Sequence, residues 1–223
     1  QVTEDIFLKM AKTAKEKTGC KNICLAGGVA LNSVANGKLI DSGLFDEVYI
    51  QPAAGDAGGA VGAALAAYHI FEGQERTAIR PDAMSGSLLG SKFSDEEIEA
   101  ALHEKGIKFS KVESESELIE KVSDLIISAN VIGWFQGRME FGPRALGNRS
   151  IIADARNPEM QKKVNLKIKF RESFRPFAPI LLEEDLQRYF DVILPSPYML
   201  QVHTWNDEWH NPLPENYSAL PWL

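Results

Sequence analysis

The stretch LAGGVALN, residues 25–32, decides the fold of this chain. An apolar run over 22–26 predicts a short strand, and it stops at the pair Gly27 and Gly28. Apolar residues then recur at helical spacing over 30–42. The stretch is therefore predicted to be a strand, a tight turn and the start of a helix.

Other elements follow from the same periodicities. Residues 47–51 are β-branched and aromatic at their centre and predict a second strand, and a helix of small residues follows over 57–68. Strands that alternate with helices predict parallel β/α units, so the fold class is α/β. Ser94 and Ser114 are each followed three residues later by Glu, the pattern that begins a helix. The remaining expected elements are helices over 3–18, 94–106 and 114–130 and strands over 108–112, 131–135 and 178–182.

Composition narrows the class of protein. The net charge of −7 over 223 residues disfavours binding to nucleic acid or to an anionic membrane. No apolar run approaches the roughly 18 residues that a transmembrane helix needs. Cys20 and Cys24 lack the two-residue gap of a metal or redox pair, so we expect two free thiols, with Cys24 in a buried strand. Few cysteines and no targeting signal predict a cytoplasmic protein, and the start at Gln1 predicts the inner part of a longer chain.

The chain is predicted to hold two domains. Residues 71–91 are polar, rich in Gly and Ser, and include Pro81, which is typical of a solvated linker. The expected division is a first domain over 1–75, a linker over 76–91 and a second domain over 92–223. The tail over 196–223 is rich in Pro, Asn and Trp and lacks clear periodicity, and we expect neither of its histidines, His203 and His210, to be catalytic.

Two glycine turns follow predicted strands. The first contains Gly27 and Gly28, and glycine lets a ligand approach backbone N–H groups at the start of a helix, where phosphate or ribose can bind. The second, GDAGGA over 55–60, has Asp56 as its one charged residue. A carboxylate at this place in a parallel sheet binds a metal, binds a ribose hydroxyl or caps the helix. A purely steric role for the glycines stays open.

A more specific segment is GWFQGRMEFGPRALGNRS over 133–150, which sets three arginines among glycines and a proline. Ten basic residues stand against four acidic ones over 136–175, a local charge of +6. The planar arginine fork donates two parallel hydrogen bonds to phosphate, and Glu140 and Glu172 are placed to hold two of the arginines. Surface ion pairs without a ligand are the alternative.

The segment KFRESFRPFAP over 169–179 repeats this pattern. Its basic residues alternate with Phe170, Phe174 and Phe177, whose rings are expected to be buried and to fix the backbone. The sequence thus predicts a rigid anion site in the second domain.

These motifs carry a resemblance to the O-carbamoyltransferases. The two glycine turns resemble the second lobe of the actin-like ATPase and sugar-kinase fold, in the version shared by carbamoyltransferases and tRNA threonylcarbamoyl-transfer enzymes. Residues 131–199 resemble the carbamoyltransferase C-terminal domain, which has a YrdC-like fold. The implied architecture is a partial actin-like lobe followed by most of a YrdC-like α/β domain.

The resemblance also implies roles for residues. Arg144, Lys169 and Arg175 would be the catalytic phosphate-binding residues, and Arg138, Arg149 and Arg171 would be further substrate-binding residues. The nucleotide would contact Gly27, Gly28, Asn32, Gly55 and Gly58, and Asp56 would bind the metal, iron or magnesium. The family's two metal-binding histidines belong to a first lobe that these residues do not match, so the chain alone is expected to be inactive.

The implied reaction transfers a carbamoyl group from carbamoyl phosphate, by way of carbamoyl adenylate made with ATP, to the hydroxyl of a small-molecule acceptor. A threonylcarbamoyl-adenylate synthase or tRNA-modifying fusion is one alternative, which the motif over 138–149 disfavours. An RNA-binding module that uses the +6 segment is another. A homodimer is compatible with the sequence, and a membrane partner is not expected.

Overall fold

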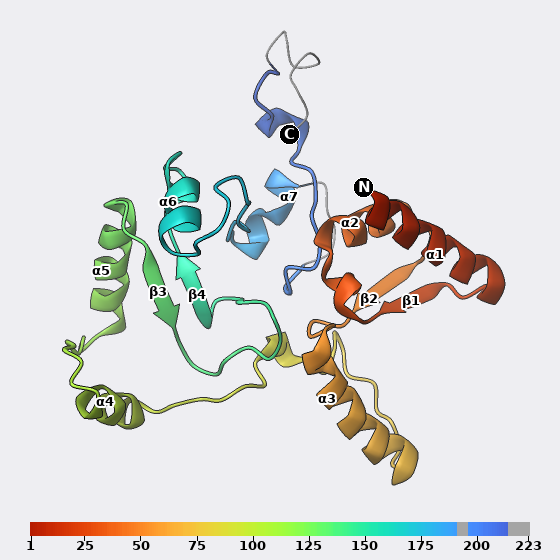
Figure 1. Cartoon of the computed structure of the whole chain (residues 1–223), viewed down its shortest axis with the longest axis horizontal. Helices are drawn as coiled ribbons and strands as arrows, with labels where there is room; N and C mark the ends of the chain where they lie inside the picture. Colours follow the sequence, from red (N-terminus) through yellow and green to blue (C-terminus); the bar gives the residue numbers. More distant parts are fainter. Residues whose placement is uncertain (191–195, 214–223) are drawn as a thin grey trace.

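The computed structural model describes residues 1–190 and 196–213 and shows a mixed α/β chain (Figure 1). An N-terminal unit packs helices around a small parallel sheet. Its elements are α1 (Val2–Thr18), β1 (Asn22–Leu25), η1 (Gly28–Leu31), α2 (Ser33–Asp41), β2 (Glu47–Ile50), α3 (Asp56–Ala66) and η2 (Ala67–Phe71). No helix among the described residues is long and apolar enough to cross a membrane.

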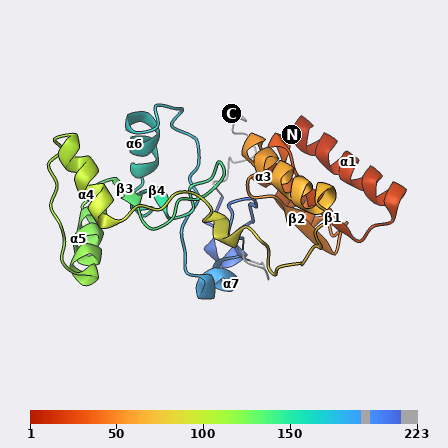
Figure 2. The ribbon, with the colours of Figure 1, turned by 90° about the horizontal axis from the view of Figure 1, so that it is seen from below.

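A second unit lies on the far side of the molecule in Figures 1 and 2, around a small antiparallel sheet. Its elements are α4 (Asp95–Glu104), α5 (Glu115–Ile127), β3 (Ile132–Phe135), β4 (Arg149–Ile152), α6 (Met160–Lys167) and α7 (Leu186–Tyr189). Single helical turns are η3 (Ser85–Ser87), η4 (Glu183–Asp185) and η5 (Asp207–Trp209).

The predicted β/α unit of the N-terminal half is confirmed. Strands β1 and β2 pair in parallel, from Asn22 opposite Glu47 to Leu25 opposite Ile50, as a crossover through α2 requires. Helix α1 ends at Gly19, which adopts the left-handed conformation (φ +64°) predicted for a terminating glycine. The predicted free thiols are confirmed, but Cys24 is exposed, because the side chains that β1 turns inward are Ile23 and Leu25.

The helix starts predicted from capping serines are also confirmed. The Ser94 hydroxyl accepts a hydrogen bond from the Glu97 backbone N–H at 3.2 Å, and the Glu97 carboxylate accepts one from the Ser94 backbone N–H at 2.8 Å, so α4 begins with a full capping box. Ser114 caps α5 through the N–H of Glu117. These local signals therefore set the two helices that begin the second unit.

Two predicted strands are wrong. Among the described residues, 108–112 and 178–182 pair with no other segment, and a strand exists only where its backbone bonds to another. Strand β3 pairs instead with β4, from Ile132 opposite Ile152 to Phe135 opposite Arg149. The sequence did not predict β4 or α6, because both lie within the arginine-rich segment, which shows no clear periodicity.

The end of the predicted linker is not solvated. Met84 and Ser87 are buried, and residues 87–91 bond to the segment 138–141 through backbone pairs such as Gly90 N to Met139 O at 2.9 Å. Residues 71–81, in contrast, are exposed throughout. The domain limits stay a prediction, with the solvated part shorter than expected.

Limited proteolysis tests this division. Trypsin is expected to cut first at Arg76, in the exposed stretch 71–81, because cleavage needs a locally free backbone. Mass spectrometry of the first fragments checks the site. First cuts within 87–92 or 138–149 would show that those hydrogen-bonded segments open more readily than the stretch before them.

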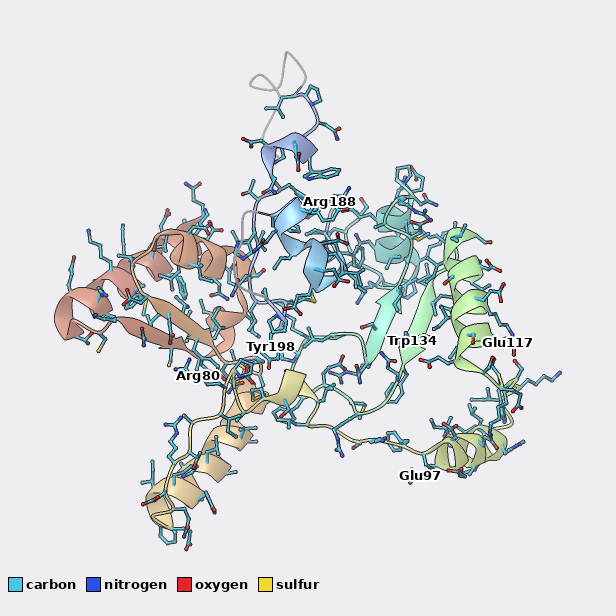
Figure 3. The ribbon with its side chains drawn as sticks, turned by 180° about the vertical axis from the view of Figure 1, so that it is seen from behind. Arg80, Glu97, Glu117, Trp134, Arg188 and Tyr198 are labelled. Carbon is cyan, nitrogen blue, oxygen red and sulfur yellow. The ribbon has the colours of Figure 1, made fainter. Side chains whose placement is uncertain are left out.

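The best-buried part of the N-terminal unit is completed by residues from the far end of the chain. Leu200 joins Ala30, Ile50 and Ala54 in one buried cluster, with Tyr198 packed against it. We call residues 198–202 the strap. Figure 3 shows labelled Tyr198 at the junction between the two units.

The strap is held by three kinds of contact. The fully buried Asn36 donates from Nδ2 to the carbonyls of Ala30 (2.8 Å) and Leu200 (2.9 Å). The Tyr198 hydroxyl donates to the Asp82 carboxylate at 3.0 Å, and burial together with Asp82 raises the pKa of Tyr198 to about 12. Gly37 lies against the Val202 carbonyl, and the space between them is too small for a Cβ. The strap therefore fastens the C-terminal half to α2.

A Gly37→Ala substitution is expected to destabilise the chain by about 1–3 kcal/mol, because the new Cβ would collide with the Val202 backbone oxygen. Gly62→Ala in α3 is the matched control, since nothing lies within 4 Å of its Cβ position and alanine favours a helix. Urea unfolding of both variants measures the difference. A Gly37→Ala protein as stable as the Gly62→Ala one would mean that the strap is not packed on α2.

Candidate functional site

The first glycine turn, residues 27–31, is fixed by hydrogen bonds and has open space beside its two glycines. Gly27 has φ +92°, a conformation that favours glycine, and its N–H donates to the Ala54 carbonyl at 2.8 Å. No atom lies within 4 Å of a Cβ built on Gly27 or Gly28. Asn32 accepts a hydrogen bond from the Ala35 N–H at 3.2 Å and so caps α2. The backbone of the turn is therefore accessible beside its glycines, whereas the Asn32 side chain is already used to cap α2.

In the structure, the loop that carries the second glycine motif (55–60) begins at Pro52 and packs beside the first turn, and we call this whole loop, residues 52–60, the second glycine turn. Gly58 has a steric reason to be glycine, because a Cβ there would collide with the Ala53 carbonyl oxygen. The N-cap of α3 is Gly55, so a capping role for Asp56 is wrong. Asp56 is the exposed first residue of the helix, where a negative charge favours the helix dipole.

Asp56 alone does not fit a transition metal. Within residues 1–190 and 196–213, no three His, Cys, Asp or Glu side chains are grouped to hold an ion. One exposed carboxylate supplies too few ligands, because such sites need three or more donors in a fixed geometry. A metal site would therefore need ligands beyond those that these residues supply.

The arginine loop, residues 138–149, is built around Glu140. Its side chain is fully buried, and Oε1 accepts from the backbone N–H groups of Leu146 (2.7 Å) and Asn148 (2.8 Å). Oε2 lies 3.6 Å from Nε of Arg149, so the predicted pairing of Glu140 with an arginine is confirmed. Burial alone would raise the pKa of Glu140, but the two N–H donors and Arg149 hold it below its usual value.

Two of the predicted arginines fix this loop to backbone carbonyls. Arg138 donates from Nη1 to the Gly90 carbonyl at 2.7 Å, and Arg149 donates from Nη2 to the Gly142 carbonyl at 3.1 Å. Each guanidinium keeps further N–H groups, because arginine has five donors. Both residues therefore shape the loop and retain donors that can face an anion.

Arg144 reaches across to the N-terminal unit. Its Nη2 donates to the carbonyl of Leu31, the last residue of the first glycine turn, at 2.9 Å. Its Nε is buried and has no hydrogen-bond partner among residues 1–190 and 196–213. Nearby, Gly142 (φ +122°) lies so close to the second turn that a Cβ would sit 3.3 Å from Cβ of Ala53. The arginine loop thus contacts both glycine turns.

The second group of predicted site residues surrounds Asn165 of α6. This buried side chain donates from Nδ2 to the carbonyls of Ser173 (3.1 Å) and Arg175 (2.8 Å). Its Oδ1 accepts from Nε of Arg171 at 2.7 Å. Nε of Arg175 also pairs with Glu172 at 2.8 Å, as predicted, whereas Lys169 is exposed.

The expected burial of the phenylalanines in this segment is wrong. Phe170 is 85% exposed, Phe174 is 74% exposed and Phe177 is 39% exposed. Arg171 lies over the Phe177 ring, 4.9 Å from its centre, a cation–π contact. The backbone is fixed by the amide of Asn165 instead of by aromatic packing.

The structure joins Arg144 to the first glycine turn, whereas Arg138 and Arg149 bond to the carbonyls of Gly90 and Gly142. Within residues 1–190 and 196–213, no hydrogen bond or ion pair joins that loop to Lys169, Arg171 or Arg175. The side chains that the sequence did not single out are Asn36, Asn165 and Tyr198. An asparagine at an inward position of a helix was the available signal for the first two, because a buried amide must bond to something.

Two models of one protein family match the chain, one in each half. Residues 1–65 match the family model described as carbamoyltransferase N-terminus, and residues 123–218 match the one described as carbamoyltransferase C-terminus. An uncharacterized protein of Synechocystis sp. is 54% identical over 222 residues, which cover 98% of this chain and 36% of that protein.

Two further relatives carry functional names. Nodulation protein NolO of Bradyrhizobium diazoefficiens is 42% identical over 193 residues, 86% of this chain and 34% of that protein. Nodulation protein U of Rhizobium fredii is 37% identical over 196 residues, 88% of this chain and 31% of that protein. The chain spans about a third of the length of these relatives. Because its two halves match the N-terminal and C-terminal family models in order, the chain belongs to the carbamoyltransferase family.

Proposed function

We propose that this chain contributes the donor-binding part of an O-carbamoyltransferase, which uses carbamoyl phosphate and ATP to carbamoylate a hydroxyl of a small-molecule acceptor. The observation that carries the proposal is Arg144, whose guanidinium lies where the arginine loop meets both glycine turns and whose Nε is buried without a partner. The family supports the carbamoyl chemistry, and Arg144 supports the place where the donor binds.

A buried unpartnered donor favours an anion. Leaving such an N–H unsatisfied costs about 1–3 kcal/mol, which a bound phosphate oxygen would remove. The guanidinium stays charged at any working pH and its fork matches two oxygens of one phosphate. The local charge of +6 over 136–175, inside a chain of −7, strengthens the attraction for a small dianion.

The proposed reaction has three bond changes. Water attacks the phosphorus of carbamoyl phosphate and breaks its bond to the carbamoyl oxygen, which gives carbamate, phosphate and a proton. A carbamate oxygen attacks the α-phosphorus of ATP, which releases pyrophosphate and forms carbamoyl adenylate. The acceptor oxygen then attacks the carbamoyl carbon and loses its proton, and AMP leaves. Charge neutralisation and positioning dominate such phosphoryl chemistry, which suits a site built of arginines.

The residues take the following parts in this proposal. Arg144, Lys169 and Arg175 neutralise phosphate oxygens, and Arg138, Arg149 and Arg171 hold the two arginine segments in shape. The first glycine turn, with Gly27, Gly28 and Asn32, and the second, with Gly55 and Gly58, would form the surface for nucleotide phosphate or ribose. The N–H groups of Gly27, Asn32 and Gly58 bond within the chain, so the backbone donors would come from Gly28 and Gly55. A metal, iron or magnesium, would need ligands other than Asp56 from elsewhere in the protein.

The finer fold assignments belong to the same proposal. The parallel β1–α2–β2 unit supports a partial actin-like lobe over 1–75, followed by a linker over 76–91. The antiparallel β3–β4 pair with its arginine loop supports a YrdC-like domain over 92–223. A cytoplasmic location is proposed because both thiols are free.

Titration calorimetry of the chain with carbamoyl phosphate tests donor binding. We expect saturable binding that weakens at least tenfold in Arg175→Ala and in Lys169→Ala. Arg156→Ala is the matched control, because Arg156 belongs to the same basic segment but is paired through two hydrogen bonds with Asp154. No binding by the folded chain, or an equal loss in the control, would refute the proposed site and favour nonspecific charge, as in the RNA-binding alternative.

A further inference from the structure

Two consecutive carbonyls of the first glycine turn are held by side chains that connect it to the C-terminal half. The Leu31 carbonyl accepts from Nη2 of Arg144 at 2.9 Å. The Ala30 carbonyl accepts from Nδ2 of Asn36 at 2.8 Å, and the same Nδ2 binds the Leu200 carbonyl of the strap at 2.9 Å. The conformation of the turn therefore depends on where the arginine loop and the strap lie.

The two contacts differ in what else they can bind. Asn36 is fully buried, so its contacts are fixed parts of the fold. Arg144 is only partly buried, and its unpartnered Nε belongs to the same rigid plane as the Nη2 that holds Leu31. A ligand bound to the guanidinium therefore limits the movement of the hydrogen bond to the Leu31 carbonyl. That hydrogen bond in turn orients the guanidinium toward the ligand.

The arginine loop also contacts the second turn directly. Gly142 packs on Ala53, whose neighbour Ala54 accepts the N–H of Gly27 at 2.8 Å. Movement of the loop would therefore reach the first turn by two routes, through the Arg144 side chain and through the Gly142 backbone.

We infer that Arg144 is a positioning residue as well as an anion ligand, and that a donor anion bound to it orders the first glycine turn. The inference rests on the proposed function for the identity of the donor. Its consequence is an order of events, in which donor binding in the arginine loop prepares the turn for its own ligand. Because binding coupling is reciprocal, a ligand on the turn also strengthens donor binding.

Hydrogen exchange of the backbone amides tests the coupling without an activity assay. The reporters are the N–H groups of Ala30 and Asn32, which bond within the turn to the carbonyls of Gly27 and Val29. In the unmodified chain, saturating carbamoyl phosphate is expected to slow their exchange at least fivefold. In Arg144→Met, which keeps an apolar stem and has no donor, exchange without ligand should be faster and carbamoyl phosphate should no longer slow it.

Arg156→Met is the matched control, because Arg156 belongs to the same basic segment but pairs with Asp154, so the fivefold slowing should persist at saturation. Gly142→Ala tests the backbone route and should also raise exchange at Ala30 and Asn32, since its Cβ would press on Ala53. If carbamoyl phosphate binds by calorimetry yet leaves exchange at these amides unchanged, the inference is overturned and the proposed function stands. If it does not bind at all, both fail.

Discussion

Replacing Arg144 by lysine is expected to weaken the use of carbamoyl phosphate by roughly ten- to a hundredfold, equivalent to about 1.4–2.8 kcal/mol. Lysine keeps the charge but loses the planar fork, so one ammonium group cannot reproduce both the bond to the Leu31 carbonyl and the second donor, Nε, toward a phosphate oxygen. The measurement is the rate of adenylate formation at low carbamoyl phosphate in the full-length protein.

Thermal stability separates this effect from a structural one. The Arg144→Lys melting temperature should stay close to that of the unmodified protein, because lysine retains the charge and most of the apolar stem. A folded variant that forms adenylate at the unmodified rate would show that Arg144 is not a phosphate ligand. A variant that unfolds would show that the residue serves mainly to join the two halves.

The second large effect is expected at Glu140. Glu140→Ala should destabilise the chain by about 2–5 kcal/mol, because it leaves two N–H groups, those of Leu146 and Asn148, without an acceptor in the interior of the loop. Glu140→Gln is the matched control, since its amide oxygen can accept from both. Urea unfolding ranks the three proteins, and a Glu140→Ala protein as stable as Glu140→Gln would contradict the proposed role of these bonds.

The charge of Glu140 adds a pH dependence of known sign. The pKa of Glu140 is lower in the folded chain than its ordinary value, so the charged form stabilises the fold above the unfolded pKa, at roughly pH 4.5. That contribution is lost as the pH falls through the folded pKa. The stability difference between the unmodified chain and Glu140→Gln should therefore be constant near neutrality and shrink in acid.

Local patterns predicted the part of the fold that local forces decide. Capping serines, the glycine after α1 and the β-branched run of β2 each act within a few residues, and all appear where the sequence places them. The strands expected over 108–112 and 178–182 failed because pairing needs a partner far along the chain. Nothing in either segment specifies that partner.

The candidate site shows the same division. The motif predicts that Glu140 pairs with an arginine, and the structure shows the partner to be Arg149, nine positions along the chain. The bond from Arg144 to Leu31 spans 113 positions and the bond from Asn36 to Leu200 spans 164, so neither has a local signal. The sequence also did not predict the exposure of Phe170 and Phe174, because hydrogen bonds from Asn165, and not aromatic packing, fix the backbone of this segment.

Isotope exchange between pyrophosphate and ATP tests the central claim most directly, because carbamoyl adenylate formation is the reversible step that the arginine site is proposed to serve. In the full-length protein, labelled pyrophosphate is predicted to enter ATP only when carbamoyl phosphate is present, and Arg144→Lys should raise the concentration needed at least tenfold. Exchange that proceeds equally without carbamoyl phosphate, or that is absent in a protein shown to transfer the carbamoyl group, would contradict the adenylate route and the donor site.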